Sequence, residues 1–160
     1  MTFLDAHAPD GLLAPGGLLG TSHRFLFKIG GQKITHMFKF ASSFNQDIGD
    51  WNVSSATDLG KMFQNALAFN QPIDGWNTSS ATDMNNMFNN AGNFNQDISD
   101  WRIDSLEDVG YMFDRFSAPV MAFNQDLGWC LNGAVDQEKA FDGTAGGDSD
   151  NPSNSCASPS

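Results

Sequence analysis

The side chains of this sequence that could carry out chemistry are few and scattered. His7, His23 and His36 all lie in the first quarter of the chain, and none is spaced from a cysteine or another histidine as zinc ligands are. The Gly-Gly pairs lack the lysine and the hydroxyl residue of a phosphate-binding loop, and no nucleophile has a base at a recognisable spacing. The sequence therefore predicts a protein that is not an enzyme and that uses no cofactor or metal ion.

The chain has two cysteines, Cys130 and Cys156, both in its last third. A bridge between them would tie down a segment that is otherwise unanchored, and two cysteines allow one connectivity. In a reducing compartment, both would instead stay free thiols. The sequence favours the disulfide and leaves the free thiols as the alternative.

Charge and hydropathy exclude several classes of protein. The 19 acidic and 8 basic residues give a formal net charge of -11, which disfavours a phosphate backbone as partner because such binding depends on lysine and arginine. No stretch reaches the roughly 18 apolar residues that span a bilayer. The N-terminus also lacks the basic start and the continuous apolar core of a signal peptide. We therefore expect a chain that neither binds nucleic acid nor inserts into a membrane.

An internal repeat of 25 residues organises the sequence. Segment 52–76 aligns with segment 77–101 without a gap, and 15 of the 25 positions are identical. Unit 34–51 enters the same register, and unit 102–129 keeps it with four extra residues around 117–121 and one fewer before its tryptophan. Such a repeat indicates a solenoid, in which each unit buries its apolar side against its neighbours.

The repeat array divides the chain into three parts. Residues 1–24 are predicted to be irregular or disordered, and residues 143–160 to form a low-complexity tail. Between them, the predicted solenoid of residues 25–142 begins with a short capping strand and ends with a decayed unit. Its parts are the cap 25–33, the repeats 34–51, 52–76, 77–101 and 102–129, and the decayed unit 130–142.

The spacing of the apolar residues predicts what each coil is made of. Apolar residues recur every three or four positions, but Ser-Ser pairs, glycine, asparagine and proline interrupt any long helix. The unit predicts a short strand near Ala-Thr-Asp-Met, one or two helical turns over residues 60–66 and an extended stretch through Phe-Asn-Gln-x-Ile. We expect an α/β, leucine-rich-repeat-like solenoid of about four to five coils. The apolar residues of one unit are Ala56, Leu59, Met62, Phe63, Ala66, Phe69, Ile73 and Trp76.

Two polar residues recur at fixed places in the unit and are assigned to folding. The asparagine of Phe-Asn-Gln would form a column in which each side chain bonds backbone of its own and the neighbouring coil. The recurring aspartate would cap exposed N–H groups at the start of a helical turn, and a cation held between stacked carboxylates is the alternative. The columns are Asn45, Asn70, Asn95 and Asn124, and Asp58, Asp83 and Asp108.

The repeated unit Ala-Thr-Asp-Met-x-x-Met-Phe-x-x-Ala-x-x-Phe-Asn-Gln-Asp-Ile-x-x-Trp resembles that of the BspA-type leucine-rich-repeat surface proteins, whose lipoprotein-type repeat is a domain of unknown function. The resemblance covers residues 34–129. The ending from Phe123 to Cys130, with the late Cys156, resembles the closing unit of such proteins from unicellular algae. The resemblance implies cell-surface placement or secretion and roles in adhesion or protein contact. It brings no catalytic residue, and no signal peptide or lipobox is visible before the array.

Positions at which the repeats differ while the core stays the same are candidates for a binding face. We expect a monomeric scaffold that contacts a protein or a glycan through them. A purely structural spacer is the first alternative. A glycan- or ice-binding solenoid is the second, although Glu107 interrupts the row of Thr57 and Thr82 that would favour it. The candidate positions are Lys61, Asn86 and Tyr111, then Gln64, Asn89 and Asp114, and the insertion 117–121.

Two Asn-x-Ser triplets, beginning at Asn52 and Asn77, occupy the same place in the repeat. They would carry N-glycans only if the chain passed through a eukaryotic secretory route. Such triplets also arise often by chance in repeats that are rich in serine and asparagine, so the sequence leaves their use open.

Overall fold

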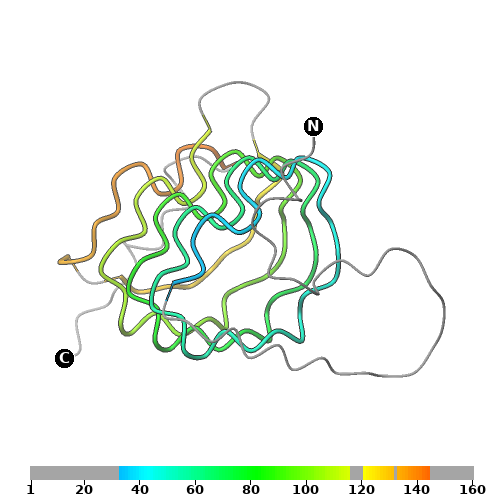
Figure 1. Cartoon of the computed structure of the whole chain (residues 1–160). Coiled ribbons are helices and arrows are strands. Elements are labelled where there is room, and N and C mark those ends of the chain that lie inside the picture. The colour runs from blue at the N-terminus through cyan, green and yellow to red at the C-terminus, as the bar shows by residue number, and fades with distance from the viewer. Residues whose placement is uncertain (1–32, 116–120, 132, 145–160) are drawn as a thin grey trace.

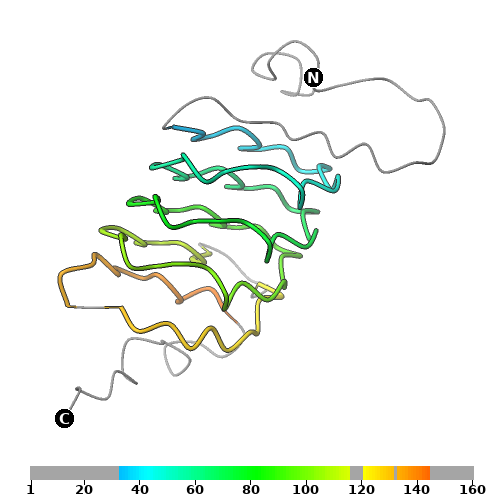
Figure 2. The same cartoon turned by 90° about the horizontal axis from the view of Figure 1, so that it is seen from below.

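The computed structural model describes residues 33–115, 121–131 and 133–144. The predicted N-terminal segment, the predicted cap except Lys33, and the tail after Thr144 lie outside these residues. The described chain winds into coils that follow similar paths when seen along the stack (Figure 1) and form successive layers when seen from below (Figure 2). This is the repeat solenoid that the 25-residue period predicts.

Single parallel bridges set the register of the coils. Asp58 is bridged to Lys33 on one side and to Asp83 on the other, and the series continues through Asp108 to Asp136. The first three steps are 25 residues long and the last is 28, because the fourth unit carries the insertion. The bridging residues mark the starts of five coils, numbered 1 to 5 in chain order.

Backbone hydrogen bonds join each coil to the next at every second residue. From coil 2, the N–H groups of Lys61 and Phe63 donate to the carbonyls of Asn85 and Met87 in coil 3, both at 2.9 Å. The same alternate positions donate from coil 1 to coil 2, from coil 3 to coil 4 and from coil 4 to coil 5. These backbone groups therefore point along the solenoid axis, and the neighbouring coil satisfies them.

The helical turn predicted for residues 60–66 is wrong. Two consecutive β-turns occupy this run, and the second is closed by the N–H of Ala66, which donates to the carbonyl of Phe63 at 2.9 Å. The third residue of each turn, Lys61 and then Asn65, has a positive φ of 60° and 61°, as in type II turns. A helix would have directed these N–H groups to its own carbonyls and left none for the next coil.

The described residues contain no helix and no strand longer than a single bridging residue. The strand predicted near Ala-Thr-Asp-Met is reduced to the single bridging residue of each coil. The solenoid is therefore built from turns and extended segments, and its α/β description by short strands and helical turns is wrong. In the same part of the chain, no helix is long and apolar enough to cross a membrane.

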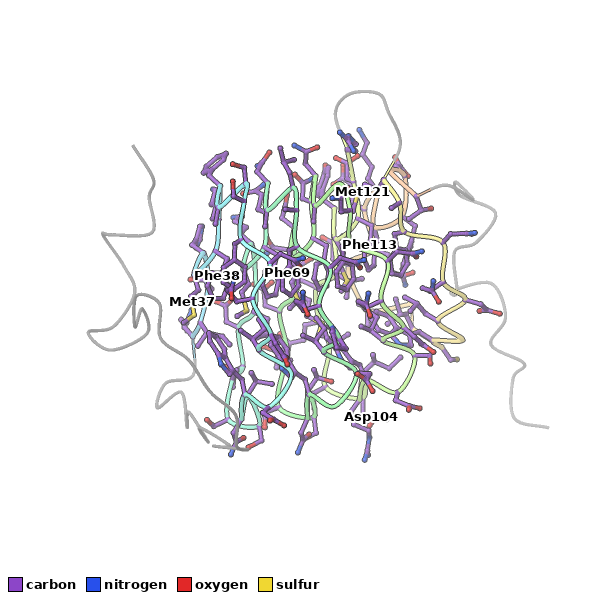
Figure 3. The ribbon with its side chains drawn as sticks, turned by 90° about the vertical axis from the view of Figure 1, so that its right-hand side faces the viewer. Met37, Phe38, Phe69, Asp104, Phe113 and Met121 are labelled. Atoms are coloured by element: carbon purple, nitrogen blue, oxygen red, sulfur yellow. The ribbon has the colours of Figure 1, made fainter. Side chains whose placement is uncertain are left out.

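Stacked phenylalanine rings fill the interior. Phe63 lies 5.5 Å from Phe88 of the next coil, and 4.0 Å from Phe69 of its own coil, measured between ring centroids. Two columns therefore run side by side along the stack, and Figure 3 shows Phe38 near one end of it, with Phe69 and Phe113 further along. One column is Phe38, Phe63, Phe88, Phe113 and Phe141, and the other is Phe44, Phe69, Phe94 and Phe123.

The tryptophans make a link between coils that the sequence does not reveal. The indole Nε1 of Trp76 donates to the carbonyl of Ile48 at 3.1 Å, and that of Trp101 donates to Ile73 at 3.0 Å. The buried indole N–H of Trp129 has no such partner, because its unit has one residue fewer between the aliphatic residue and the tryptophan. The shortened unit thus loses one bond between coils.

Candidate binding face

The four asparagines of the Phe-Asn-Gln motif form a column along one run of the coils. The Oδ1 of Asn45 accepts the backbone N–H of Asn70, and the Oδ1 of Asn70 accepts that of Asn95, each at 2.9 Å. The following glutamine adds a second bond, from the Nε2 of Gln96 to the Oδ1 of Asn70 at 2.8 Å. The column ends at Asn124, whose N–H donates to Asn95 at 2.9 Å. These side chains hold coils together.

The bridging aspartates cap backbone N–H groups within their own coil. The Oδ1 of Asp83 accepts the N–H of Asn85, two residues on, at 2.8 Å, and Asp58 and Asp108 make the equivalent bond. The capped segment is a β-turn, where the sequence predicted a helical turn. Two neighbours reduce the repulsion in the column. The Nδ2 of Asn85 lies 2.8 Å from Asp83 and 3.4 Å from Asp108, and Lys33 pairs with Asp58 at 3.3 Å.

Asp83 lies in the middle of this column, and its pKa is raised above the ordinary value of 3.8. Burial is the main cause, and the nearby carboxylates of Asp58 and Asp108 add to it, while hydrogen bonds from Asn85 oppose it. A carboxyl whose pKa is raised by folding favours the fold when protonated. Its contribution to stability is present below pH 3.8 and is lost as the pH rises through the folded pKa.

We therefore expect Asp83→Asn to raise the free energy of unfolding at neutral pH, by less than about 1 kcal/mol because solvent screens the column. The asparagine Oδ1 can still accept the N–H of Asn85. Chemical denaturation at a series of pH values would show the gain shrinking toward zero as the pH falls below 3.8.

Asp97→Asn is the matched control for this prediction. The pKa of exposed Asp97 is lowered by hydrogen bonds from Ser99, so its ionised form favours the fold above pH 3.8 and that contribution is lost as the pH falls. Asp97→Asn should therefore not stabilise the chain at neutral pH. A gain from Asp97→Asn equal to that from Asp83→Asn would contradict the role of burial and column repulsion.

The described residues show no constellation typical of an active site. No three histidine, cysteine, aspartate or glutamate side chains within them are grouped to hold a metal ion. His36 is exposed, and its pKa is lowered by partial desolvation and by the charges of Lys39 and Lys61. A hollow of about 170 Å³ is acidic, unlike the apolar pockets that hold most small molecules. It is lined by Asp74, Gln96, Asp97 and Asp100.

One column of residues has a left-handed backbone in every coil. It consists of the residue three positions after each bridging residue, and its φ values lie between 49° and 63°. Such values cost a residue other than glycine roughly 1–2 kcal/mol. Three predicted binding residues belong to this column, and all three are partly exposed. The column is His36, Lys61, Asn86, Tyr111 and Lys139.

The second set of predicted binding residues does not face outward. Gln64 is half-buried, whereas Asn89 and Asp114 are 1% and 5% exposed. The Nε2 of Gln64 donates to the Oδ1 of Asn89 at 3.4 Å. The prediction that Asn89 and Asp114 face outward is wrong, because the β-turns direct this variable position inward. Of the insertion, residues 117–120 lie outside the described residues and Met121 is buried.

Sequence reasoning missed an exposed aromatic residue beside the left-handed column. Phe40 has a φ of 63° and is 61% exposed, in the place that Asn65 and Asn90 hold in the next two coils. The Nζ of Lys39 lies 5.2 Å from its ring centroid, within cation–π distance. An aromatic residue that replaces asparagines suited to a left-handed turn is the signal that could have identified it. The left-handed column together with Phe40 is named the turn face.

Tyr111 connects the turn face of coil 4 to coil 5. Its hydroxyl donates a hydrogen bond to the carboxylate of Glu138, and the Nζ of Lys139 lies 6.0 Å from the ring centroid. The hydrogen bond to Glu138 is the main reason why the pKa of Tyr111 is raised to about 12. The phenol therefore stays neutral, and its hydroxyl is held by Glu138.

The described cysteine and the asparagines of the two Asn-x-Ser triplets lie at the surface. Cys130 is exposed and disulfide-bonded, while its predicted partner, Cys156, lies outside the described residues. Asn52 and Asn77 are both exposed. The Oδ1 of each accepts the N–H of the serine two residues on, at 3.1 Å. The Cys130–Cys156 pairing and the use of the two triplets stay predictions.

A family model described as "Mycoplasma protein of unknown function, DUF285" matches residues 32–152. The chain belongs to the DUF285 family. The match spans all five described coils of this DUF285 protein, including residues 34–129 on which the resemblance to BspA-type repeats rests. No curated protein and no solved structure matches it.

Proposed function

We propose that this DUF285 solenoid is a non-enzymatic scaffold that contacts a protein partner through the turn face. The observation that carries the proposal is the left-handed column of unlike residues. Glycine takes a positive φ freely. A backbone that needed only to form these turns would therefore favour glycine at the positions of the left-handed column. Histidine, lysine and tyrosine stand there instead. Backbone strain that persists at equivalent positions is a reason to infer function in the side chains.

The side chains of the turn face suit a protein partner with acidic and apolar groups. Two aromatic rings, of Phe40 and Tyr111, each lie within cation–π distance of a lysine. Aromatic residues dominate the energetics of many protein interfaces. Lys61 and Lys139 place positive charges on this face of a chain whose net charge is -11, and these lysines would attract acidic groups of a partner.

The resemblance to BspA-type surface proteins supports a role in adhesion or contact at the cell surface or in a secreted protein. A purely structural spacer is the competing proposal. It makes the opposite prediction, because a spacer has no saturable partner and its outer side chains can be changed freely.

Replacing Phe40, Lys61 and Tyr111 together by glycine should abolish partner retention without unfolding the chain. Glycine relieves the positive φ at all three positions, and its greater freedom in the unfolded chain offsets part of that gain, so the variant is expected to stay folded. The measurement is quantitative mass spectrometry of proteins retained by the immobilised chain from extracts and medium of its source cells. Denaturation of the variant checks its fold.

The matched control changes three exposed aspartates, Asp50, Asp74 and Asp100, to alanine. The control should retain the same proteins as the original chain, at least about tenfold more than the glycine variant does. Equal retention by the glycine variant, or no retained protein on the original chain, would contradict the proposal and favour the spacer.

A further inference from the structure

Four buried polar atoms of coils 3 and 4 have no hydrogen-bond partner among the described residues. They are the Nδ2 of Asn89, the Oδ1 of Asn90, the Oδ2 of Asp114 and the Nε of Arg115. Asn89 and Asp114 as whole residues are 1% and 5% exposed. Buried polar groups are almost always paired, so an unpaired one needs a physical explanation. These four residues are named the polar seam.

The repeat places the polar seam as two pairs, each with one residue in coil 3 and one in coil 4. Asn89 and Asp114 hold the same position in successive units, as do Asn90 and Arg115. The N–H of Asn90 donates to the carbonyl of Asp114 at 2.9 Å, so the two backbones are in contact here. Arg115 also extends over coil 3, because its Nη1 lies 3.3 Å from the place that a Cβ on Gly92 would occupy. Each pair therefore sets one donor in one coil against one acceptor in the next.

Two rows of side-chain hydrogen bonds run from coil 2 to coil 3 and stop at the polar seam. The Nε2 of Gln64 donates to the Oδ1 of Asn89 at 3.4 Å, and the Nδ2 of Asn90 donates to the Oδ1 of Asn65 at 2.6 Å. Gln64 also fixes the amide of Asn89, since turning that amide over would set two N–H groups against each other. The next bond of each row would cross from coil 3 to coil 4, and in the described chain both bonds are missing.

The spacing of the coils suits a single bridging atom between these side chains. The rings of Phe88 and Phe113, each one residue before a member of the polar seam, lie 5.5 Å apart. A hydrogen bond to a water oxygen is about 2.8 Å long, so one water spans up to about 5.6 Å between a donor and an acceptor. Because a water both accepts and donates, it fits a pair made of one N–H and one oxygen.

The mixture of groups in the polar seam disfavours an ion. A cation would be attracted by the carboxylate of Asp114 and repelled by the guanidinium of Arg115, and an anion would meet the opposite conflict. A neutral molecule of the size of water avoids both conflicts. It can also turn to satisfy a donor on one side and an acceptor on the other.

We propose that the polar seam binds ordered water, with one molecule bridging Asn89 to Asp114 and another bridging Arg115 to Asn90. The waters continue the two rows of side-chain hydrogen bonds from coil 3 to coil 4 and so help to hold these coils together. The site lies inside the stack, so the proposal is independent of any partner of the turn face.

Water–protein cross-peaks in NMR spectra of the isotope-labelled chain test the proposal. The side-chain amide protons of Asn89 should show a cross-peak to a long-lived water, because the bridging molecule is held beside them. The indole N–H of Trp101 is the internal control. It is similarly buried, at 3% exposure, and donates directly to the carbonyl of Ile73 at 3.0 Å, so it should show none. The absence of a water cross-peak at Asn89 would overturn the proposal.

Two substitutions at Asp114 test the same water through stability. Asp114→Leu and Asp114→Asn both remove the charge, but only leucine removes the acceptor and leaves the water short of a partner. The unfolding equilibrium constant of Asp114→Leu should therefore be at least about fivefold larger than that of Asp114→Asn. Without a bound water, Asp114 would be an unpaired buried group whose replacement by leucine costs nothing. A leucine variant at least as stable as the asparagine variant would therefore also overturn the proposal.

Discussion

Replacing Phe88 by alanine is expected to lower the free energy of unfolding by about 3–5 kcal/mol. The ring is fully buried and stands at the centre of its column, 5.5 Å from Phe63 and 5.5 Å from Phe113. It also stacks on Phe94 of its own coil at 3.9 Å. Because each coil contacts only its neighbours, a cavity here weakens two coil interfaces at once. Denaturation by urea, followed by tryptophan fluorescence, measures the change.

Phe141→Ala is the control at the end of the same column. Its ring stacks on Phe113 alone within the described residues, at 5.7 Å, so its loss affects one interface. The expected destabilisation is clearly smaller than that of Phe88→Ala. Equal losses at the two positions would show that the column does not act as a stack of nearest neighbours.

Replacing Asn70 by alanine is expected to cost about 1–3 kcal/mol of stability, because partly buried donors lose their acceptor. The Oδ1 of Asn70 accepts the N–H of Asn95 at 2.9 Å and the Nε2 of Gln96 at 2.8 Å. Both bonds run from coil 3 to coil 2, so the substitution separates two coils along this run. The same denaturation measurement applies.

Asn70→Asp is the matched control for the asparagine column. Aspartate keeps the acceptor oxygen that both bonds use, so it should retain most of the stability that alanine loses. An aspartate variant as unstable as the alanine variant would show that the side-chain oxygen is not what holds these coils together.

The sequence was sufficient for the solenoid and for its core. Phenylalanine, tryptophan and aliphatic residues recur at the same places because each must meet its equivalent in the next coil, so their identity and spacing carry the packing information. Phe63, Phe88 and Phe113 form the column that their period predicts. The Asn45 to Asn124 column is also found, because an asparagine at the same place in every unit can make the same hydrogen bond to the next coil.

The local backbone could not be predicted in the same way. Apolar residues three positions apart fit one turn of helix and also fit two β-turns in succession, so the sequence predicts helical turns over residues 60–66 where the chain forms β-turns. A positive φ is normally inferred from glycine or asparagine, and Lys61 and Tyr111 give no such sign. Whether a position faces outward depends on that backbone, so the sequence alone predicts Asn89 and Asp114 at the surface although both are buried.

The left-handed turns that present the turn face are tested most directly by one NMR measurement on the isotope-labelled chain. A positive φ brings the amide proton of a residue close to its own α-proton. Strong intraresidue cross-peaks are therefore expected at Lys61, Asn86 and Tyr111, and weak ones at the adjacent Met62 and Met87, which serve as internal controls. Weak cross-peaks throughout, with the sequential amide contacts of a helix over residues 60–66, would contradict the turn architecture and the proposal that rests on it.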